Sequence, residues 1–594
     1  MPKLGTLPEL RSGRTSEEMA CRLSGVGAAG RSAPRVGREE GTVAVVVNAG
    51  ESDAQVAAPT DRRPIRGAEP DPAAGPAAAV AATVQRLRAG VTDFRLTASV
   101  ALCVFLGLLL RNRWIFTRTV YEYGDEALNS IQVRQGKALE LLVGHYSRVG
   151  FHHPGPAFLY VQTIGEVLFH DLIPVAASPF GAQQIALLAL NATVLALVAR
   201  IIWRNTGSLT YALLAVVIPV VYLGYRSASI GVNPLSSTWM PYLFMAPTLL
   251  LLVSAASVST GRTRDLPTLA FAGLLLMHGH VSFILIVSGI VAASVALPVL
   301  RRLRTHTAQW ELDRRAVLVS AGIVVVFLVP IVANLALHWP GEFGKYVKYG
   351  NSSQAGGHGV GRAVEYMVDY WWHGDHPVYA MLAIAAVAVL CAVTHPDPQI
   401  RRYLTGAVVA GLAASALMVY YAARGIDEID QIYIGQWSSM VEPLLLWVVA
   451  ARLWTAFRPA RVATGQAVLA AASAAAVLAA LWVPQASNPY RGFPQTPRVL
   501  AKLEAFSGGR TILLDVGPDI GPNVPGVVLQ ATRTGHRVCL LDPGQALFVT
   551  DDYVCTASDR QRGVEVYARE PKDTQPSSPT TIGVLDRTRF STQP

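Results

Sequence analysis

Residues 86–110 read RLRAGVTDFRLTASVALCVFLGLLL, an arginine-rich approach followed by a continuous apolar run over 96–110. An uncharged apolar run of this kind predicts a membrane-spanning helix, which requires about 20 mostly apolar residues. Basic residues collect on the cytoplasmic side of such helices, so Arg86, Arg88 and Arg95 predict a cytoplasmic N-terminus. The stretch therefore predicts the first span of an integral membrane protein.

Ten further apolar stretches follow, each near the ~20 residues that a bilayer requires. Arginines gather in every second loop between them, which predicts that those loops are cytoplasmic. Eleven spans then leave the C-terminal region outside the cell, in a multi-pass protein of the plasma membrane. The stretch 266–300 is open to interpretation as one broken segment or a short hairpin. The later spans are predicted at 180–203, 208–224, 239–258, 266–279, 281–300, 316–337, 378–394, 403–421, 437–456 and 463–483.

The composition agrees with a membrane protein. Hydrophobic residues make up 52% of the 594 residues and charged residues only 15%, and the mean hydropathy is +0.35. A soluble domain has about 25% charged residues, so a single soluble globule is excluded. Disorder over most of the length is excluded as well, because too much apolar surface would remain in water. The arginines beside the spans explain the net charge of +10, and no nucleic-acid partner is expected.

Regions of different composition flank the predicted membrane domain, which covers 94–483. Residues 1–93 are rich in Arg, Gly, Ala and Pro and predict a disordered cytoplasmic tail. Residues 484–570 predict a small extracytoplasmic α/β domain, and 571–594 are expected to be disordered. The domain's helices are predicted at 499–506 and 526–533, and its strands at 511–516, 537–541 and 564–568.

The chain has five cysteines, and only Cys539 and Cys555 lie close together in this strand-rich region. Thiols outside the cytoplasm are oxidised to disulfides. If the region is extracytoplasmic, the two cysteines are therefore expected to form a disulfide.

Two external loops, 117–179 and 338–377, are long and polar. The first begins with Tyr121-Glu-Tyr-Gly-Asp125-Glu126, and adjacent carboxylates just beyond a span have to face water or a cavity. Apolar side chains at helical spacing follow and predict an amphipathic helix on the membrane surface. Asp125 and Glu126 would lie in its first turn, where the helix dipole favours their charged forms. Taken by themselves, Asp125 and Glu126 are explained equally well as residues that cap the helix and have no catalytic role.

About thirty residues later comes His152-His153-Pro154-Gly155-Pro156, followed by a largely apolar helix over 157–169. This order resembles the GT-C superfamily of integral-membrane glycosyltransferases, closest to the aminoarabinose-transferase and protein O-mannosyltransferase branch. The motifs cover the first three or four spans, and the remainder is similar in topology only. The resemblance implies a polyprenyl-phosphate sugar as donor, Asp125 as general base and Glu126 as the second choice. The abundance of Ala, Arg, Gly and Val suggests an actinobacterial-type protein.

A polyprenyl-phosphate leaving group departs as a stable anion, so no general acid is needed. One carboxylate that accepts the proton of an acceptor hydroxyl, opposite the departing phosphate, is sufficient for inversion. The resemblance therefore implies inverting transfer of a sugar to a glycan, lipid or protein of the cell envelope. Arabinose and mannose are the candidate sugars, and the sequence does not choose between them.

The donor phosphate requires cations beside it. Loop 338–377 offers Lys345, Lys348 and Arg362, and Arg226 follows the third span. For each of them, a solvated side chain at the membrane surface is the alternative. The residues expected to line the cavity are Tyr123, His152, His153, Asn233 and His280.

A divalent metal is an open question. Asn233-Pro234 stands where the aminoarabinose-transferase pattern carries Asp-Pro, and the lost charge puts a metal or second acid there in doubt. His373-Gly-Asp375-His376 has ligand-type side chains but no third-ligand pattern that would fix a geometry.

Two other functions remain open at this point. A transporter or flippase of lipid-linked sugars would be expected to have repeat symmetry and broken helices at mid-membrane, of which only the His278–His280 region is a candidate. A catalytically inactive glycan-binding scaffold is the other, because Asn233 departs from the family pattern.

Overall fold

The computed structural model describes residues 76–230, 232–305, 310–352, 357–371, 377–431, 433–456, 475, 477, 494–517, 521–570 and 580–593. In these ranges, eight helical segments are long and apolar enough to cross a membrane, and two shorter apolar helices accompany them. A small domain with a mixed β-sheet follows at the C-terminal end. The predicted class, a helical membrane protein with a C-terminal α/β domain, is confirmed.

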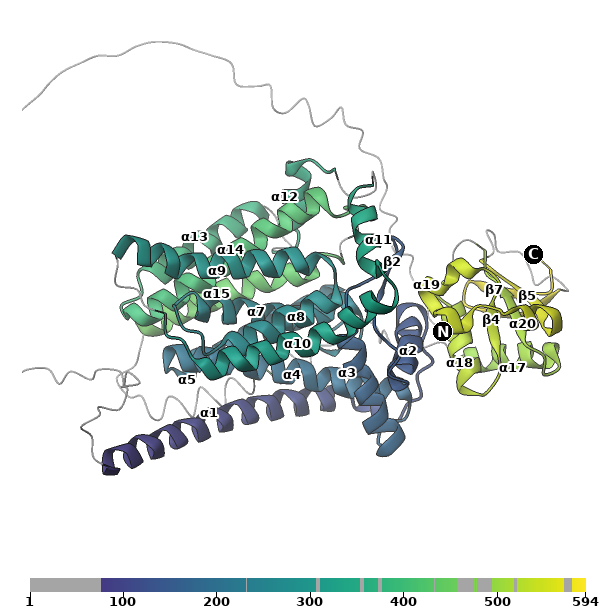
Figure 1. Cartoon of the computed structure of the whole chain (residues 1–594), viewed down its shortest axis with the longest axis horizontal. Helices are drawn as coiled ribbons and strands as arrows, with labels where there is room; N and C mark the ends of the chain where they lie inside the picture. Colours follow the sequence, from purple (N-terminus) through teal and green to yellow (C-terminus); the bar gives the residue numbers. More distant parts are fainter. Residues whose placement is uncertain are drawn as a thin grey trace, which may run out of the picture. The chain divides into compact units, whose positions relative to one another are not determined.

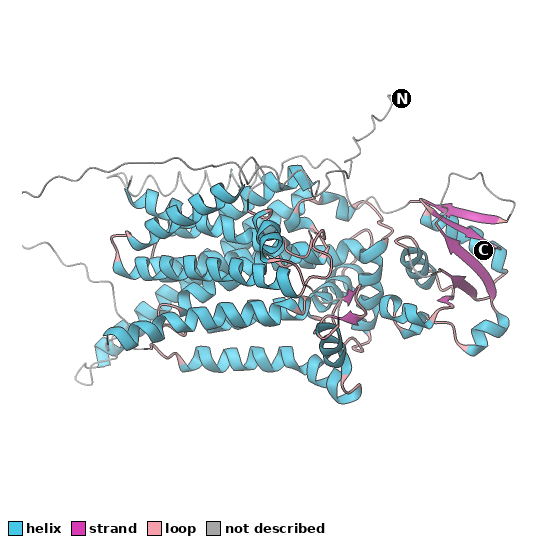
Figure 2. Ribbon diagram, turned by 90° about the horizontal axis from the view of Figure 1, so that it is seen from above, coloured by secondary structure: helices cyan, strands magenta, loops and turns pink. Residues whose placement is uncertain are grey.

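The helices of the membrane domain run along one another (Figures 1 and 2). Ten of the eleven predicted spans lie in these helices, and the eleventh, 463–483, lies outside the described residues except for 475 and 477. The helices are α1 (Pro76–Arg111), α4 (Pro179–Thr206), α5 (Leu209–Ile230), α6 (Met240–Leu243), α7 (Met245–Val258), α8 (Leu266–Gly279), α9 (Ser282–Thr305), α10 (Arg314–Leu337), α13 (Pro377–Val393), α14 (Pro398–Arg424) and α15 (Val441–Ala456), which a 3₁₀ turn, Gln436–Met440, precedes.

The stretch 266–300 forms two helices, so the hairpin interpretation is correct. α8 ends at Gly279, and His280 has an extended backbone before α9 begins. Gly279 packs directly against aromatic rings, since an added Cβ would lie 2.3 Å from the ring of Phe244. Only glycine fits there unless the ring shifts.

The prediction of disorder up to residue 93 is wrong for its last part, because α1 begins at Pro76. Proline suits the first turn of a helix and alanine is the best helix former, so the Ala-rich stretch after Pro76 is helical without an apolar period. Asp93 is buried and fixes the helix, as it accepts hydrogen bonds from Arg200 (2.8 Å) and Arg204 (3.0 Å) of α4.

The segments outside the spans gather at the end of the bundle where α1 finishes (Figure 1). They are α2 (Gly124–Lys137), a hairpin of β1 (Tyr146–Ser147) and β2 (Phe151–His152), α3 (Ala157–Glu166) with its π-helical extension Val167–Leu172, α11 (Gly341–Gly350) and α12 (Val360–Val368). The helices predicted after the Asp-Glu pair and after the His-Pro motif are thus both present.

The C-terminal domain contains a five-stranded sheet in the order β4-β3-β5-β7-β6. Its strands are drawn as magenta arrows near the C-terminus in Figure 2. β4, β3 and β5 are parallel, while β7 and β6 pair antiparallel at one edge. A disulfide joins Cys539 and Cys555, as predicted. The elements are α17 (Thr496–Ser507), β3 (Ile512–Asp515), α18 (Val524–Arg533), β4 (Val538–Leu540), α19 (Ala546–Val549), α20 (Ala557–Arg562), β5 (Val564–Arg569), β6 (Thr581–Leu585) and β7 (Thr588–Ser591).

The prediction of disorder beyond residue 571 is wrong for residues 580–593, which form the β6–β7 hairpin. Phe590 and Leu585 are buried in the core of the C-terminal domain. The hairpin completes the sheet beside β5, so its stability comes from tertiary pairing, which its polar local sequence did not indicate.

The sequence predicted that the apolar face of α2 lies on a membrane surface, but in the structure this face is covered by other parts of the chain. Ala127, Leu128 and Ile131 belong to the same buried cluster as the core of the C-terminal domain. Leu139, which follows at helical spacing from these side chains, lies beyond the helix and is 78% exposed. The C-terminal domain therefore supplies the apolar partner of α2.

Candidate active site

Asp125 lies in the first turn of α2, at the end of the bundle where α2, the hairpin and α11 gather. The Tyr146 hydroxyl donates a hydrogen bond to its Oδ1 (2.5 Å), and the Trp239 indole N–H donates to its Oδ2 (2.7 Å). Both donors are neutral, and no ion pair with Asp125 occurs among the described residues. The carboxylate is half-buried and fixed in orientation, and it retains lone pairs that can accept a further proton.

Glu126, the neighbouring carboxylate, is in a less polar environment. Burial raises the pKa of Glu126 to about 7; its own backbone N–H opposes this rise, while the charges of Asp125 and Glu122 add to it. A carboxyl group that titrates near neutral pH can carry a proton or release it under working conditions. Asp125 and Glu126 are therefore chemically different, although they are adjacent in the sequence.

Glu126→Gln is expected to stabilise the protein above about pH 7 and to have no effect near pH 4. The pKa of the unfolded side chain lies near the ordinary glutamate value of 4.5, whereas the folded side chain keeps its proton to about pH 7, so the wild-type protein loses stability as the pH rises between these values. Glutamine has no proton to lose. The gain, on the order of 2 kcal/mol at high pH, is measured as the melting temperature of the purified protein across this range.

The control for this prediction is Glu140→Gln, because Glu140 is an exposed carboxylate just beyond the same helix. It should leave the melting temperature unchanged at every pH. Equal melting temperatures of Glu126→Gln and wild type at pH values above about 8 would contradict the assignment.

Trp239 belongs to an aromatic cluster beside Asp125, and Arg226 is a separate buried cation. The Trp239 ring packs against those of Tyr242 (centroids 5.3 Å apart) and Tyr433 (5.4 Å). Arg226 is buried, and its Nη1 donates to the Tyr370 carbonyl at 3.0 Å. Of the four predicted phosphate-binding cations, Arg226 is the buried one, whereas the other three are exposed.

The three cations of the 338–377 loop have different surroundings. Lys345 pairs with Glu342 at 2.8 Å, and Arg362 pairs with Asp430 at 2.7 Å while remaining half exposed. Lys348 is exposed on α11 and has no ion pair among the described residues. Lys348 is therefore available to an anion, whereas Lys345 and Arg362 already have carboxylate partners.

His152 lies between the hairpin and α11. Its backbone N–H donates to Glu342 Oε2 (2.6 Å), and its carbonyl accepts from the Tyr346 hydroxyl (2.6 Å). Burial disfavours the charge of Glu342, but hydrogen bonds from His152 and Lys345 outweigh it and lower the pKa of Glu342 to about 2. Since Tyr146 belongs to the same hairpin, one small element joins Asp125 to the lysine-bearing helix.

His153 and His280 meet at the break between α8 and α9. Their rings lie 4.2 Å apart, and the Val281 N–H donates to His153 Nδ1 at 3.4 Å. Burial lowers the pKa of His153 well below its usual value, so its ring is neutral. The contacts of the described residues place neither ring on Asp125, and the His-Pro motif joins the 117–179 loop to the α8–α9 turn.

Asn233 and Tyr123 have local structural roles. Asn233 is buried, and its Oδ1 accepts from the Leu235 N–H, which caps the short turn Pro234–Ser236 on the way to Trp239. Tyr123, half-buried, is the residue that precedes α2 and therefore Asp125. Asn233 thus fixes the turn that leads to Trp239, and Tyr123 directly precedes the helix that carries Asp125.

Glu122 is a functional residue that the sequence reasoning missed. Its side chain is completely buried and accepts two hydrogen bonds from Arg533 of α18 (2.7 and 2.8 Å) and one from Ser130 (3.1 Å). Gly526 of the same helix lies so close that an added Cβ would be 2.4 Å from the Glu122 carbonyl oxygen. These contacts hold the C-terminal domain against Glu122, which lies three residues before Asp125 in the sequence.

Within the described residues, no group of three or more His, Cys, Asp or Glu side chains could hold a metal ion. His373, Asp375 and His376 lie outside those residues.

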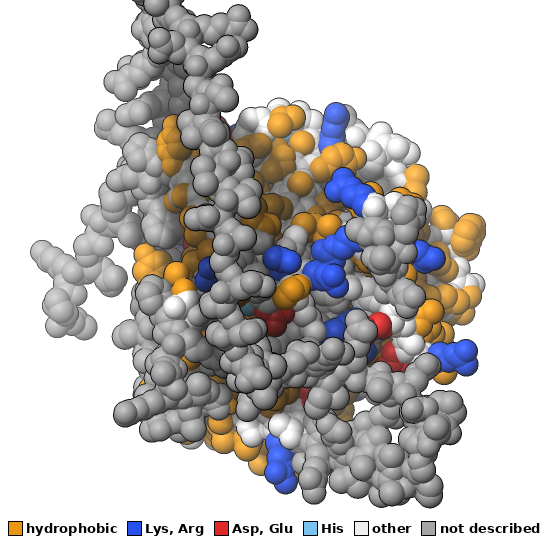
Figure 3. All heavy atoms as spheres, turned by 90° about the vertical axis from the view of Figure 1, so that its left-hand side faces the viewer, with side chains coloured by type: hydrophobic (Ala, Val, Ile, Leu, Met, Phe, Trp, Pro, Cys, Tyr) orange, Lys and Arg blue, Asp and Glu red, His pale blue; other side chains and the backbone are white. Residues whose placement is uncertain are grey.

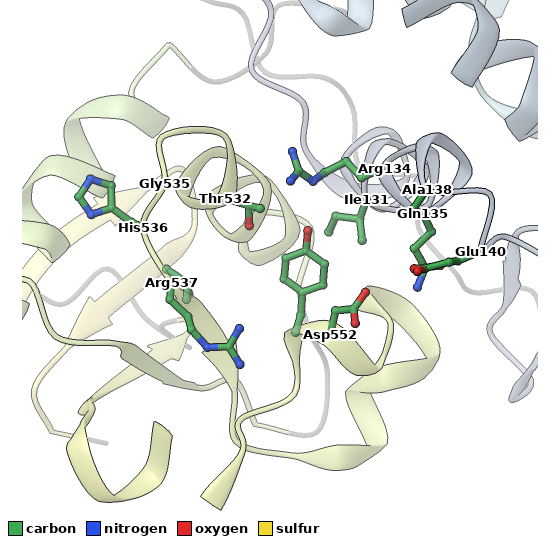
Figure 4. A pocket seen from close by; sticks show the side chains of 12 residues that line it. Ile131, Arg134, Gln135, Ala138, Glu140, Thr532, Gly535, His536, Arg537 and Asp552 are labelled. Carbon is green, nitrogen blue, oxygen red and sulfur yellow. The ribbon is translucent and has the colours of Figure 1, made fainter. Parts of the chain in front are cut away.

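A cavity of about 430 Å³ lies farther along α2, where the helix meets the C-terminal domain (Figure 4). Its lining is mostly polar, with both signs of charge. Arg134, Gln135 and Glu140 approach from the side of α2, and His536, Arg537 and Asp552 from the domain. The mixture of hydrogen-bond donors and acceptors is suited to a polar, hydroxyl-rich ligand.

No known family model and no curated protein sequence matches the chain. Solved structures do match. ArnT from Cupriavidus metallidurans in the apo state is 12% identical, with a TM-score of 0.50 over 85% of this chain and 98% of that one. ArnT from the same organism bound to undecaprenyl phosphate gives a TM-score of 0.49 at 12% identity, over 83% and 98%. The chain thus has an ArnT-like membrane fold at low sequence identity.

Proposed function

We propose that the protein is a glycosyltransferase that moves a sugar from a polyprenyl-phosphate donor to an acceptor in the cell envelope, outside the cytoplasm. The ArnT-like fold supports the class of reaction. The observation that carries the proposal is the geometry of Asp125, whose two carboxylate oxygens are held by Tyr146 and Trp239 without a cation.

Asp125 acts as the general base in this proposal. A positioned carboxylate accepts the proton of the acceptor hydroxyl as its oxygen attacks the anomeric carbon. The bond from that carbon to the phosphate oxygen breaks on the opposite face, and polyprenyl phosphate leaves as an anion. The displacement is direct, so the anomeric configuration inverts. Tyr146 and Trp239 keep the carboxylate aimed during the attack.

The departing phosphate is stabilised by cations near the same end of the bundle. Arg226, a buried cation near the C-terminal end of α5, is the principal candidate, and Lys348 on α11 is the second. Guanidinium and ammonium groups form charge-assisted hydrogen bonds to phosphate. Lys345 and Arg362 take a smaller part, because carboxylates neutralise them.

The orientation follows from the two ends of the bundle. Arginines of α4, α9 and α14 lie at the end opposite Asp125, where Figure 3 shows basic side chains gathered, and we place that end in the cytoplasm of a plasma membrane. Asp125 and the C-terminal domain with its disulfide then lie outside, where disulfides persist. The acceptor is a glycan, lipid or protein of the envelope, with arabinose or mannose as the transferred sugar.

The test uses the full-length protein in vesicles with polyprenyl-phosphate arabinose or mannose and a cell-envelope fraction as acceptor. We expect the donor to be consumed and free polyprenyl phosphate to appear in equal amount. Nucleotide sugars serve as the control and should not be consumed. Movement of the lipid-linked sugar across the bilayer without hydrolysis or transfer would instead indicate a flippase, and binding of glycan without turnover an inactive scaffold.

A further inference from the structure

A second cavity, of about 650 Å³, lies at the end of the bundle opposite Asp125. Segments of α1, α4, α8 and α10 and the residues just before α8 and α10 surround it. Figure 3 shows the face at this end, with basic side chains next to apolar ones. Its charged lining consists of Arg200, Arg204, Arg264 and Arg315 together with Asp93, Asp265 and Asp313.

In this second cavity, here named the arginine cavity, aspartates form ion pairs with the guanidinium groups. Asp93 and Asp265 are buried and pair with Arg204, which contacts both, at 2.7 and 3.5 Å. Arg200 binds Asp93 through Nε at 2.8 Å and keeps a third of its side chain exposed. The terminal nitrogens of Arg200 have no hydrogen-bond partner among the described residues. The cavity thus presents donors that are fixed in place but not used.

The charge balance favours an anion. Four arginines face three aspartates, and the carboxylate of Asp313 is occupied by the Ala316 N–H at the start of α10. Arg315 is exposed and has no ion pair among the described residues. The N-terminal ends of α8 and α10 both border the cavity and add partial positive charge. A phosphate group is the ligand that this set of donors binds most strongly.

The rim of the arginine cavity is apolar and continues along α10. Trp203, Pro267 and Val319 line the cavity beside the arginines. On α10 only Ala316 is buried, and Leu318 is 73% exposed. In a membrane this helix faces lipid, so hydrocarbon can lie along it while a charged headgroup enters the cavity. The ligand that fits both features is amphipathic.

We propose that the arginine cavity binds the phosphate headgroup of an anionic membrane phospholipid, whose acyl chains lie against α10. Basic pockets between membrane helices on the cytoplasmic side are a known form of lipid site. Arg200 and Arg315 contact the phosphate, and Asp93 and Asp265 position the arginines. The site is separate from Asp125, and the inference does not depend on the proposed reaction.

The test is native mass spectrometry of the full-length protein in detergent with phosphatidylglycerol or phosphatidylcholine, each with and without millimolar inorganic phosphate. The wild type is expected to retain phosphatidylglycerol at least tenfold better than phosphatidylcholine, and inorganic phosphate should not displace it. The double variant Arg200→Gln/Arg315→Gln is expected to lose this preference. Arg315→Glu should lose the preference for phosphatidylglycerol as well. Because Arg315 is exposed, this change should leave the fold unaffected.

Arg401→Gln is the matched control, because Arg401 is an exposed arginine at the same end of the bundle but outside the cavity. It should keep the preference for phosphatidylglycerol. Three results would overturn the proposal: equal retention of the two lipids by the wild type, unchanged retention in Arg315→Glu, or displacement of the lipid by inorganic phosphate. The last would show a site for soluble phosphate.

Discussion

Asp125→Asn is expected to lower kcat for sugar transfer by about 10²- to 10⁴-fold, the usual contribution of a general base. Asparagine has the shape of aspartate, and its carbonyl oxygen can still accept from the Trp239 indole. Its amide nitrogen can donate to the Tyr146 hydroxyl oxygen, which reverses that hydrogen bond without moving either group. The variant therefore loses the proton acceptor but keeps the geometry of the site.

The measurement is the initial rate of polyprenyl-phosphate release in vesicles, together with the melting temperature and the affinity for the donor. The last two should be close to those of the wild type. Asp427→Asn is the control, because Asp427 is a carboxylate paired with Arg148 on the hairpin that carries Tyr146, yet it does not contact Asp125. It should keep most of the activity. A fully active Asp125→Asn would remove Asp125 from the reaction.

Arg533→Ala is expected to destabilise the protein by about 3–5 kcal/mol, because it leaves Glu122 as a buried charge without a partner. Glu122 has no exposed side-chain surface, and the pair is the polar centre of the contact between α2 and the C-terminal domain. Loss of the pair should also release the domain. The melting temperature and the rate of proteolysis of the C-terminal domain in the full-length protein report the two effects.

The double variant Glu122→Gln/Arg533→Leu separates charge from packing. It removes both charges, so it should be more stable than Arg533→Ala alone. The matched control is Arg537→Ala, which breaks an equally short pair with Asp559 in the same domain. Since Arg537 is half exposed, that loss should be about 1 kcal/mol or less. If Arg533→Ala destabilised the protein no more than Arg537→Ala, the domain contact would not be essential.

The membrane domain could be predicted from the sequence because its helices follow directly from apolar length. The same criterion missed the early start of α1, which depends on alanine-rich helix propensity and on the burial of Asp93 by α4. It also missed the β6–β7 hairpin, which exists only by pairing with β5. Features that depend on a distant partner left no local pattern.

In the candidate site, too, the sequence predicted the local features but not the contacts between distant residues. The placement of Asp125 and Glu126 in the first turn of a helix followed from the sequence, because it is a local property. Their surroundings did not, since Trp239 is 114 residues from Asp125 and Arg533 is 411 residues from Glu122. Glu122 itself could have been noticed as the third carboxylate of the Tyr121–Glu126 stretch. Its arginine has no signal in the sequence.

The most direct test of the central claim is photo-crosslinking of the full-length protein with a polyprenyl phosphate that carries a diazirine next to the phosphate. Mass spectrometry of the labelled peptides locates the phosphate. We expect label on the β1–β2 hairpin, on the segment around Trp239 and at the C-terminal end of α5, all near Asp125. Unlabelled polyprenyl phosphate should suppress this label. Crosslinks confined to the arginine cavity, with none on these three segments, would contradict a donor site at Asp125.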